Sequence, residues 1–416
     1  MFLFVKSNTE DTDIIKIKVF LHEDGVPSGF HIGRMTLHTF NPDHDWAMAA
    51  GQWHVTPPIA AVRLRRELCW LPVLWAARGD CVLVDSVAEA ERAVAEACDA
   101  LQRAGMTSST VATLSGTATL CDEAMLRGGA TLRNTAMLTA SVDSVAPWGW
   151  DHAVREHLTA LHVPPRAMPD GKRIDDIKAL SHRRTAALLT DGLRDTIADD
   201  TVITDSRATC YDYGSVERLL GERGDIVVKA PWSGSGRGVR FMRGGTMTAH
   251  ESGWIKNVLK RQGCVTVEPY YNKVMDLAME YVCDGAGSVS YCGLSVFATA
   301  GAAYRGNMIA SELRLCQTVT QLVPKRTLDT VREAVRRQIG VVCRGRYAGP
   351  VGVDMMIVRD WTTERLRLHP CVEINFRRTM GHVALSVGKL LDGDACGTMR
   401  ITRDDNNNYK ITFDFR

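Results

Sequence analysis

A single lysine followed at once by a glycine-rich loop is the first feature of this sequence that suggests chemistry. Residues 225–240 read DIVVKAPWSGSGRGVR, in which Lys229 ends an apolar run. Its ammonium therefore needs an anion or water close by. A glycine loop presents backbone N–H groups that can approach a phosphate closely. The loop residues are Ser233, Gly234, Ser235, Gly236, Arg237 and Gly238.

The order of lysine and loop excludes two common phosphate-binding motifs. A Walker loop places its lysine after the glycines, and a dinucleotide fingerprint opens a helix. Here the lysine comes first, and the strand-like VRFM follows the loop. The order predicts a strand hairpin over phosphates, with an ordinary β-turn beside a surface lysine as the alternative.

Acidic residues inside apolar strands form a second constellation. Asp354 interrupts VGVDMMIV, and Glu373 and Asn375 are two positions apart in LHPCVEIN, so they share one face of a strand. Oxygen donors of this kind suit Mg²⁺, which also bridges phosphate oxygens. A buried salt bridge to Arg377 or Arg378 is the alternative, and it is favoured for Asp354 taken alone. Together with Lys229 and its loop, the set favours a Mg²⁺ site.

The elements that must position these residues fall into two kinds. The first part of the chain alternates strand-like runs (14–20, 34–40 and 81–85) with helix-like ones (Ile59–Ala77 and 86–105), which predicts a Rossmann-like parallel α/β domain over 1–145. Residues 146–180 are expected to connect the domains with one short helix. From 181 to 416 helices mix with many strands, which predicts an α+β domain in two lobes, ending in a hairpin that turns at 406–408.

The order of these motifs resembles the ATP-grasp superfamily, over about residues 180–400. The segments that carry the resemblance are VVKAPWSGSGRGV, VEPYY with MDLAMEY, VGVDMMIV and VEINFRRTMG. The E-x-N followed by arginine is the most specific of them. The resemblance implies two lobes that hold ATP between them, with a hinge near 268–276, and an N-terminal Rossmann-like domain that helps to bind substrate.

The resemblance also implies a role for each matching residue. Lys229 would contact the phosphates and the Gly234–Gly238 loop would cover them, while Glu268 would lie beside adenine and Asp276 at the ribose hydroxyls. The residues expected to carry Mg²⁺ are Asp354, Glu373 and Asn375. Arg377 would face the transferred phosphoryl group, with Arg378 as an alternative because Phe376 stands where the family often has proline.

Three further groups of residues are candidates for substrate contacts. After the strand at 34–40, Asn41, His44 and Asp45 could reach the cleft, although turn formation alone explains Asn-Pro-Asp. The segment 181–183, Ser-His-Arg, could meet phosphate or start a helix. Tyr304 and Asn307 could face the acceptor, although a polar turn between strands is the commoner meaning.

The implied reaction is ATP-dependent ligation of a carboxylate to an amine through an acyl phosphate, with small-molecule or peptide substrates. A small-molecule kinase of the same fold and a non-catalytic ATP-binding regulator remain alternatives. An oxidoreductase is disfavoured because no G-x-G-x-x-G follows an early strand.

Length and composition restrict the classes of protein to which this chain can belong. With 416 residues, two or three packed units are expected. A net charge of +2 without a basic stripe disfavours nucleic acid, and no apolar run is long enough to span a membrane. The twelve cysteines include no C-x-x-C pair, which indicates mostly buried, reduced thiols. We expect a cytoplasmic protein, with a homodimer as the default assembly.

Overall fold

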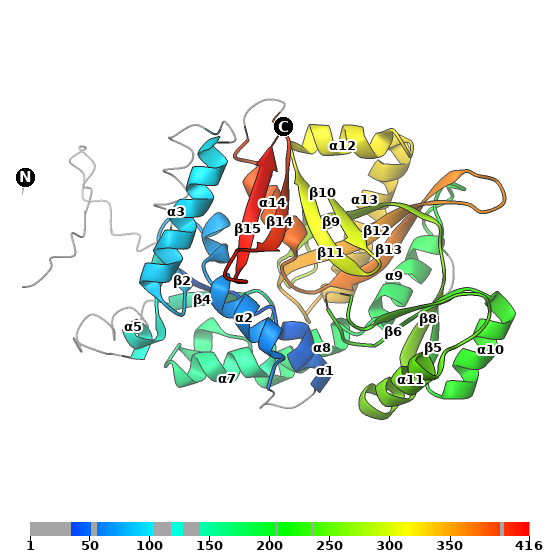
Figure 1. The fold of residues 1–416 in the computed structure, drawn as a ribbon, viewed down its shortest axis with the longest axis horizontal. Coiled ribbons are helices and arrows are strands. Elements are labelled where there is room, and N and C mark those ends of the chain that lie inside the picture. Colours follow the sequence, from blue (N-terminus) through cyan, green and yellow to red (C-terminus); the bar gives the residue numbers. More distant parts are fainter. Residues whose placement is uncertain are drawn as a thin grey trace, which may run out of the picture. The chain divides into compact units, whose positions relative to one another are not determined.

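Three β-sheets form the framework of the described part of the chain (Figure 1). The computed structural model describes residues 35–50, 56–103, 106, 118–127, 142–204, 207–234, 236–391 and 395–415. The predicted strand at 14–20 and the loop residue Ser235 lie outside these ranges.

The first sheet is parallel and has the strand order β3-β2-β1-β4. Its strands are β1 (Met35–Thr39), β2 (Asp80–Leu83), β3 (Ala118–Cys121) and β4 (Val142–Pro147). The helices of this part of the chain are α1 (His44–Ala50), α2 (Ile59–Glu67), α3 (Val87–Arg103) and α5 (Glu123–Arg127). The predicted strands at 34–40 and 81–85 and the helix at 86–105 are confirmed as β1, β2 and α3. Because α1 follows β1 directly, its side chains are placed at the carboxyl end of that strand, where parallel sheets form crevices.

The predicted helix over Ile59–Ala77 is wrong beyond its first half. The helix α2 ends at Glu67, and a short 3₁₀ helix, η1 (Leu71–Leu74), follows. Pro72 has no N–H to donate, and its ring would clash with the carbonyl of Leu68 in a continuous α-helix. The segment from Leu68 to Leu74 is also buried almost throughout rather than on one face, so its apolar residues do not mark a single amphipathic helix.

The connecting region contains more helix than predicted. It holds α7 (His152–Ala160), the 3₁₀ turn η2 (Pro165–Ala167) and α8 (Gly171–Leu180). The side chains of Asp151 and Asp170 accept hydrogen bonds from backbone N–H groups of the first turns of α7 and α8. Two capped helices therefore form where one was expected, because each has its own aspartate N-cap.

The second sheet is antiparallel, with the order β5-β8-β6-β7. It comprises β5 (Ala208–Cys210), β6 (Ile226–Lys229), β7 (Val239–Met242) and β8 (Val265–Pro269), with helices α10 (Tyr213–Arg223) and α11 (Ala249–Gln262). The glycine loop joins β6 to β7, in which Lys229 pairs with Val239. The predicted strand–loop–strand arrangement is confirmed.

The third sheet is the largest, with the antiparallel order β13-β12-β9-β10-β11-β14-β15. Its strands are β9 (Lys273–Cys283), β10 (Val289–Ala300), β11 (Ala303–Ile309), β12 (Gly349–Arg359), β13 (Leu366–Asn375), β14 (Gly397–Arg403) and β15 (Tyr409–Phe415). The accompanying helices are α9 (Arg184–Arg194), α12 (Glu312–Thr320), α13 (Lys325–Cys343) and α14 (Met380–Gly388). The main hydrophobic core lies between this sheet and helices α9 and α13.

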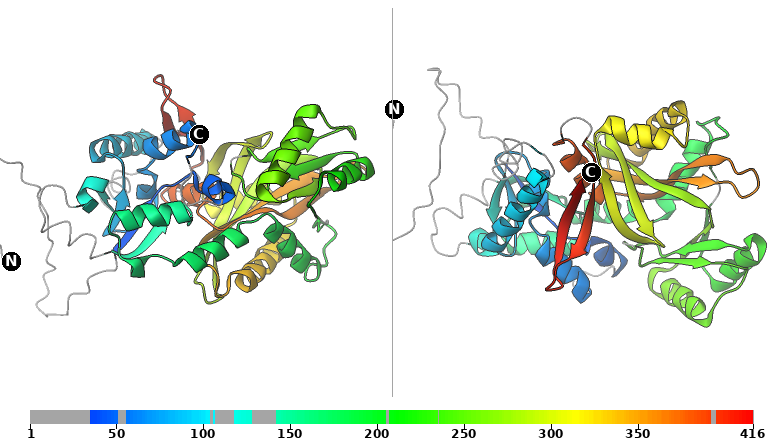
Figure 2. Two further views of the ribbon diagram at one scale, coloured as in Figure 1. Left: turned by 90° about the horizontal axis from the view of Figure 1, so that it is seen from below. Right: turned by 45° about the horizontal axis from the view of Figure 1, so that its top comes forward.

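The last two strands form the predicted hairpin around residues 406–408, and Asn407 adopts the left-handed conformation with φ of 63°. In Figure 2 this hairpin lies beside the N-terminal helices, and its residues Met399 and Ile411 share a hydrophobic cluster with Leu68 and Trp148. The C-terminal strands thus join the large sheet to the N-terminal unit.

A parallel α/β unit followed by two antiparallel lobes is the predicted fold class, and it is confirmed. The domain boundaries and the Rossmann-like character of the first unit stay predictions. Most of the cysteines are buried, as expected. Within the described ranges no helix combines the length and apolar character needed to cross a bilayer.

Candidate functional site

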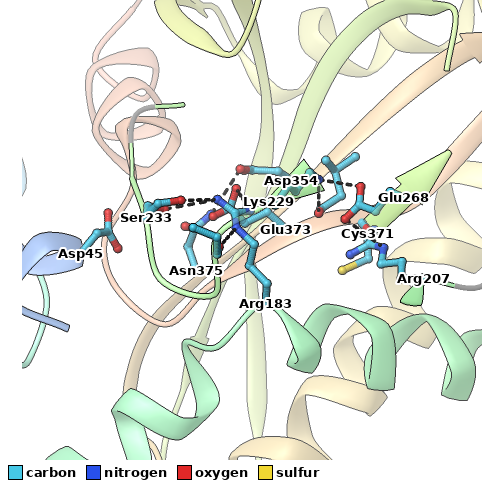
Figure 3. Close-up of polar contacts among 12 residues, drawn as sticks. Asp45, Arg183, Arg207, Lys229, Ser233, Glu268, Asp354, Cys371, Glu373 and Asn375 are labelled. Atoms are coloured by element: carbon cyan, nitrogen blue, oxygen red, sulfur yellow. Dashed lines mark hydrogen bonds and ion pairs between the residues drawn. The ribbon is translucent and has the colours of Figure 1, made fainter. Parts of the chain in front are cut away.

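A cavity of about 680 Å³ is lined by residues of the second and third sheets and of the segments that follow β1 and β4. The predicted site residues that line it are Asp45, Lys229, Ser233, Gly234, Gly236, Glu268, Asp276, Tyr304, Asn307, Asp354, Glu373, Asn375 and Arg377. Residues far apart in the sequence therefore meet at one place, as Figure 3 shows for several of them.

Lys229 lies at the end of β6 as one member of a buried charged triad. Its Nζ is 2.6 Å from Glu268 Oε2, and Arg207 Nε is 3.4 Å from Glu268 Oε1. Burial lowers the pKa of Lys229, although the Glu268 carboxylate opposes this shift. Burial would raise the pKa of Glu268, but Arg207 and Lys229 outweigh it and hold the pKa at about 2. The triad has two cations for one anion, so it carries excess positive charge.

Three glycines of the loop after Lys229 lie very close to neighbouring atoms, and at Gly236 the neighbour is backbone. A Cβ on Gly234 would lie 2.1 Å from Asp45 Oδ2, and one on Gly236, where φ is +72°, would lie 2.1 Å from the carbonyl oxygen of Ala302. A Cβ on Gly238 would meet Ser233 Oγ at 2.2 Å. The loop therefore passes closely between α1 and the turn that joins β10 to β11.

Arg183, in the segment expected to meet phosphate or start a helix, connects this loop to the acidic strands. It is buried just before α9, and its Nη1 lies 2.9 Å from Glu373 Oε2. The same guanidinium donates to Ser233 Oγ at 3.1 Å and to the carbonyl of Ala230 at 2.9 Å. The neighbouring His182 packs edge-on against Trp232, and burial lowers its pKa to about 4.

The predicted metal ligands come together on two neighbouring strands. Asp354 of β12 is the cross-strand partner of Glu373 of β13, and Asn375 Nδ2 donates to Asp354 Oδ2 at 3.3 Å. Burial raises the pKa of Asp354 to about 8, and the carboxylates of Glu373 and Glu280 add to the shift. Crowded carboxylates beside an amide oxygen are a donor set that fits Mg²⁺, because a divalent cation would relieve their repulsion. In the described ranges no group of three or more His, Cys, Asp or Glu residues is arranged to hold a metal, so the fit depends on Asn375 as the third ligand.

The two candidate arginines have different surroundings. Arg377 lines the cavity and contacts Asp45 with two hydrogen bonds, of 3.0 Å from Nη2 and 3.3 Å from Nε. Arg378 stacks its guanidinium 4.5 Å over the ring of Trp75, and burial lowers its pKa to about 10. Of these two arginines, only Arg377 lines the cavity.

The predicted substrate contacts divide into two groups. Asn41 and His44 are buried outside the cavity lining, where both contact Asp151 Oδ2, at 3.1 and 3.2 Å. Tyr304 and Asn307 line the cavity, and Tyr304 donates to Asn307 Oδ1 at 2.5 Å. Asp45 also lines the cavity, so the structure brings three of these five residues to it.

Asp276 lies at the cavity edge on β9. Its Oδ2 accepts hydrogen bonds of 2.6 Å from both Lys273 Nζ and Thr299 Oγ1. Tyr270, at the end of β8, packs edge-on against Phe241 of β7, and both line the same cavity. An aromatic wall beside a carboxylate is suited to a planar base joined to a sugar.

Arg207 and Glu280 are charged residues at the site that the sequence analysis missed. Arg207, which contacts Glu268 and the carbonyl of Cys371, has no sequence signal around it. Glu280 interrupts the apolar run of β9 much as Asp354 interrupts β12, so the same signal could have found it. It is 1% exposed, accepts from Thr379 Oγ1 at 2.9 Å and lies 2.9 Å from His382 Nδ1.

No protein-family model matches this sequence, and a search of curated proteins gave no match. Among solved structures the chain is similar to N5-carboxyaminoimidazole synthetase from Staphylococcus aureus complexed with ADP, with 11% identity, a TM-score of 0.44 and coverage of 89% of this chain and 83% of that one. It is also similar to a complex of biotin carboxylase from Campylobacter jejuni with β,γ-ATP, with 12% identity, a TM-score of 0.49 and coverage of 90% and 77%.

A third similar structure is the biotin carboxylase domain dimer of 2-oxoglutarate carboxylase from Hydrogenobacter thermophilus, in complex with MgADP, ADP and bicarbonate. It shares 13% identity at a TM-score of 0.44, with coverage of 76% of this chain and 74% of that one. Since the three TM-scores are below 0.5, we infer the chemistry from the residues around the cavity.

Proposed function

We propose that this chain is an ATP-grasp enzyme that joins a carboxylate to an amine at the expense of ATP. One observation carries the proposal: the lysine, the glycine loop, the paired acidic strands and a buried arginine all line a single cavity. Each of these residue types has a defined task in phosphoryl transfer to a carboxylate.

The nucleotide would lie between the second and third sheets. Lys229 and the backbone of the loop would bind the phosphates, and the excess positive charge of the Lys229–Glu268–Arg207 triad favours an anion there. We place the base near Phe241 and Tyr270 and the ribose at Asp276. Glu268 would lie near the base, and its carboxylate, 2.6 Å from Lys229 Nζ, would also orient Lys229.

Asp354, Glu373 and Asn375 would hold Mg²⁺, which when bound supplies positive charge beside the phosphate oxygens. Arg183 and Arg377 are the nearby side chains that supply fixed positive charge. Arg377 would stabilise the charge on the γ-phosphoryl group as it passes to the substrate carboxylate. The bond from the phosphorus to the β-phosphate oxygen breaks, a bond to the carboxylate oxygen forms, and ADP is the leaving group.

The second half of the reaction consumes the acyl phosphate. An amine attacks the carbonyl carbon, inorganic phosphate leaves, and the amine loses one proton as the amide forms. Water would compete with the amine, so the intermediate must be covered. The glycine loop, which approaches α1 and the β10–β11 turn closely, would cover it.

The first experiment measures ATP binding by calorimetry with and without Mg²⁺, on the native protein, Lys229→Ala and Glu373→Ala. Binding to the native protein that weakens in both variants supports the site. ADP and phosphate release that requires both a carboxylate and an amine, with an amide product, then supports ligation. A phosphoester product would indicate a kinase, and ATP binding without turnover would indicate a regulator.

The expected partners are two small-molecule or peptide substrates and a second copy of this chain. Sedimentation measurements over a range of protein concentrations test the homodimer.

A further inference from the structure

We infer that the carboxylate substrate is an α-amino acid with a large apolar side chain. The inference rests on the proposed function and assigns the substrate class for the same cavity. It is carried by an apolar wall next to an Arg–Asp pair, both inside the cavity lining.

The apolar wall comes from elements that do not form the phosphate site. It consists of Phe40, Leu64, Trp148, Met380 and Ile401, all of which line the cavity. These residues also belong to one hydrophobic cluster, so they lie together rather than around the whole cavity. Phe40 and Trp148 form its base, with ring centroids 5.0 Å apart in an edge-to-face arrangement. An apolar surface open to a cavity is best covered by an apolar part of a ligand.

The charged pair beside this wall matches the head of an amino acid. Arg377 and Asp45 present opposite charges 3.0 Å apart. Two hydrogen bonds join them, from Arg377 Nη2 to Asp45 Oδ2 at 3.0 Å and from Arg377 Nε to Asp45 Oδ1 at 3.3 Å. A zwitterion can replace this internal pair, with its carboxylate on Arg377 and its ammonium on Asp45. The carboxylate then lies where we expect the phosphoryl group to arrive.

The wall and the charged pair are neighbours through the backbone. The N–H of Arg378 donates to the carbonyl of Trp148 at 2.9 Å, which fixes Trp148 beside the residue that follows Arg377. Phe40 precedes α1, the helix that carries Asp45. One ligand can therefore contact both, with its side chain on the wall and its head on the pair.

The neutral polar residues that line the cavity on β10 and β11 already form hydrogen bonds with one another. Tyr304 donates to Asn307, and Asn307 Nδ2 donates to Ser295 Oγ at 2.8 Å. They offer no free charge to a substrate side chain. An acidic or basic side chain placed against the five wall residues would lose its hydration to an apolar surface.

The test is calorimetric binding of amino acids to the protein with Mg²⁺ and a non-hydrolysable ATP analogue. L-Phenylalanine, L-leucine, glycine, L-aspartate and L-lysine form the panel, with 3-phenylpropionate as the analogue that lacks the ammonium group. We expect phenylalanine or leucine to bind about tenfold or more tightly than glycine, because each buried methylene adds to discrimination. Aspartate and lysine should bind no better than glycine.

Two variants test the apolar wall and the Arg377–Asp45 pair separately. Leu64→Ser, at a partly buried position on α2, should weaken phenylalanine binding and leave glycine binding unchanged. Asp45→Asn should remove the preference for phenylalanine over 3-phenylpropionate. Leu188→Ser is the matched control, because Leu188 is 63% exposed on α9 and does not line the cavity.

The outcomes distinguish this inference from the proposed function. The protein could bind ATP and hydrolyse it with other carboxylates, while polar amino acids bind as well as apolar ones or no amino acid binds. In that case the proposed function stands and the assigned substrate class is wrong. If the native protein does not bind ATP at all, both fall. Selective binding of an apolar amino acid that Leu64→Ser weakens, with Leu188→Ser unaffected, supports the assignment.

Discussion

At the scale of single residues, the site contains buried charged side chains whose charges are not fully balanced by their neighbours. Lys229 and Arg207 share Glu268, and Asp354 lies beside two other carboxylates. Such arrangements are costly in an empty protein and become favourable when a ligand supplies the missing charge. Replacing the residues that carry the unbalanced charge should therefore change ligand binding.

Replacing Lys229 by alanine should weaken ATP binding by about tenfold or more. The change removes the contact of Lys229 with the phosphates, and it also removes one of the two positive charges beside Glu268. Calorimetry measures the change. Lys325→Ala is the matched control, since Lys325 is an exposed residue paired only with Asp329 on α13. Equal ATP affinity in Lys229→Ala and native protein would remove Lys229 from the site.

The titration of Asp354 should appear in both stability and Mg²⁺ binding. Its pKa is raised from 3.8 to about 8, so the folded protein retains a proton that the unfolded chain has already lost. The stabilisation this gives is complete below the unfolded pKa, falls as the pH rises towards about 8, and is then lost. Mg²⁺ needs the charged form, so its binding should release a proton at pH 6.5 and little at pH 9.

Calorimetry in buffers of different ionisation enthalpy counts the released protons. Asp354→Asn should abolish the release and flatten the fall in free energy of unfolding between pH 5 and pH 8, measured by urea denaturation. A native protein whose stability rises over that range would contradict the assignment.

Sequence reasoning identified much of the site because breaks in apolar periodicity are local signals. Lys229, Asp354 and Glu373 each stand where an apolar strand should continue, and all three line the cavity. Arg207 carries no such signal, since its role depends on a contact across the sheet. Asn41 was a candidate for the cleft, with turn formation as the alternative, and its side chain bonds to Gly149 and Asp151, which no local pattern reveals.

At the scale of elements, the glycine loop is the part of the fold with the least room for change. Gly236→Ala should prevent the loop from taking its present position, because the added Cβ would lie 2.1 Å from the backbone oxygen of Ala302, and Gly234→Ala should displace the Asp45 side chain, whose Oδ2 would lie 2.1 Å from the added Cβ. We expect little loss of global stability, since the loop is at the surface of the cavity, but a large loss of amide formation relative to ATP hydrolysis.

Gly253→Ala is the control for these variants. Gly253 lies in α11 with nothing within 4 Å of the added Cβ, so this change should be neutral or stabilise the helix by up to about 1 kcal/mol. Coupled assays of ADP and amide measure the ratio of hydrolysis to ligation. Unchanged ratios in both loop variants would show that the loop does not cover the intermediate.

Elements with strong local signals were predicted well, and those fixed by packing were not. The helix α3 has an alanine- and glutamate-rich amphipathic pattern, and the β6–loop–β7 hairpin has its glycines. The chain after Glu67 has apolar spacing that also fits a helix, but its burial on several sides favours a turn and η1. Local propensity does not contain that information.

At the scale of the whole molecule, nucleotide binding should stabilise the second and third sheets together. The cavity lining includes residues of β6 and β12, so a nucleotide bound between these sheets would contact both. ATP and Mg²⁺ at a hundred times the dissociation constant should add about 2.7 kcal/mol to the free energy of unfolding. Thermal denaturation measures the shift, and Glu373→Ala should reduce it.

The contact of Gly234 with Asp45 bears on the order in which the substrates bind. The carboxylate that we assign to the amino acid's ammonium is also the surface on which the loop closes, so the loop and that substrate share one contact. We expect an obligatory sequence in which nucleotide enters first, the amino acid follows, and ADP departs last. A dead-end analogue of the amino acid would then be uncompetitive against ATP in steady-state kinetics, whereas a noncompetitive pattern would indicate random entry.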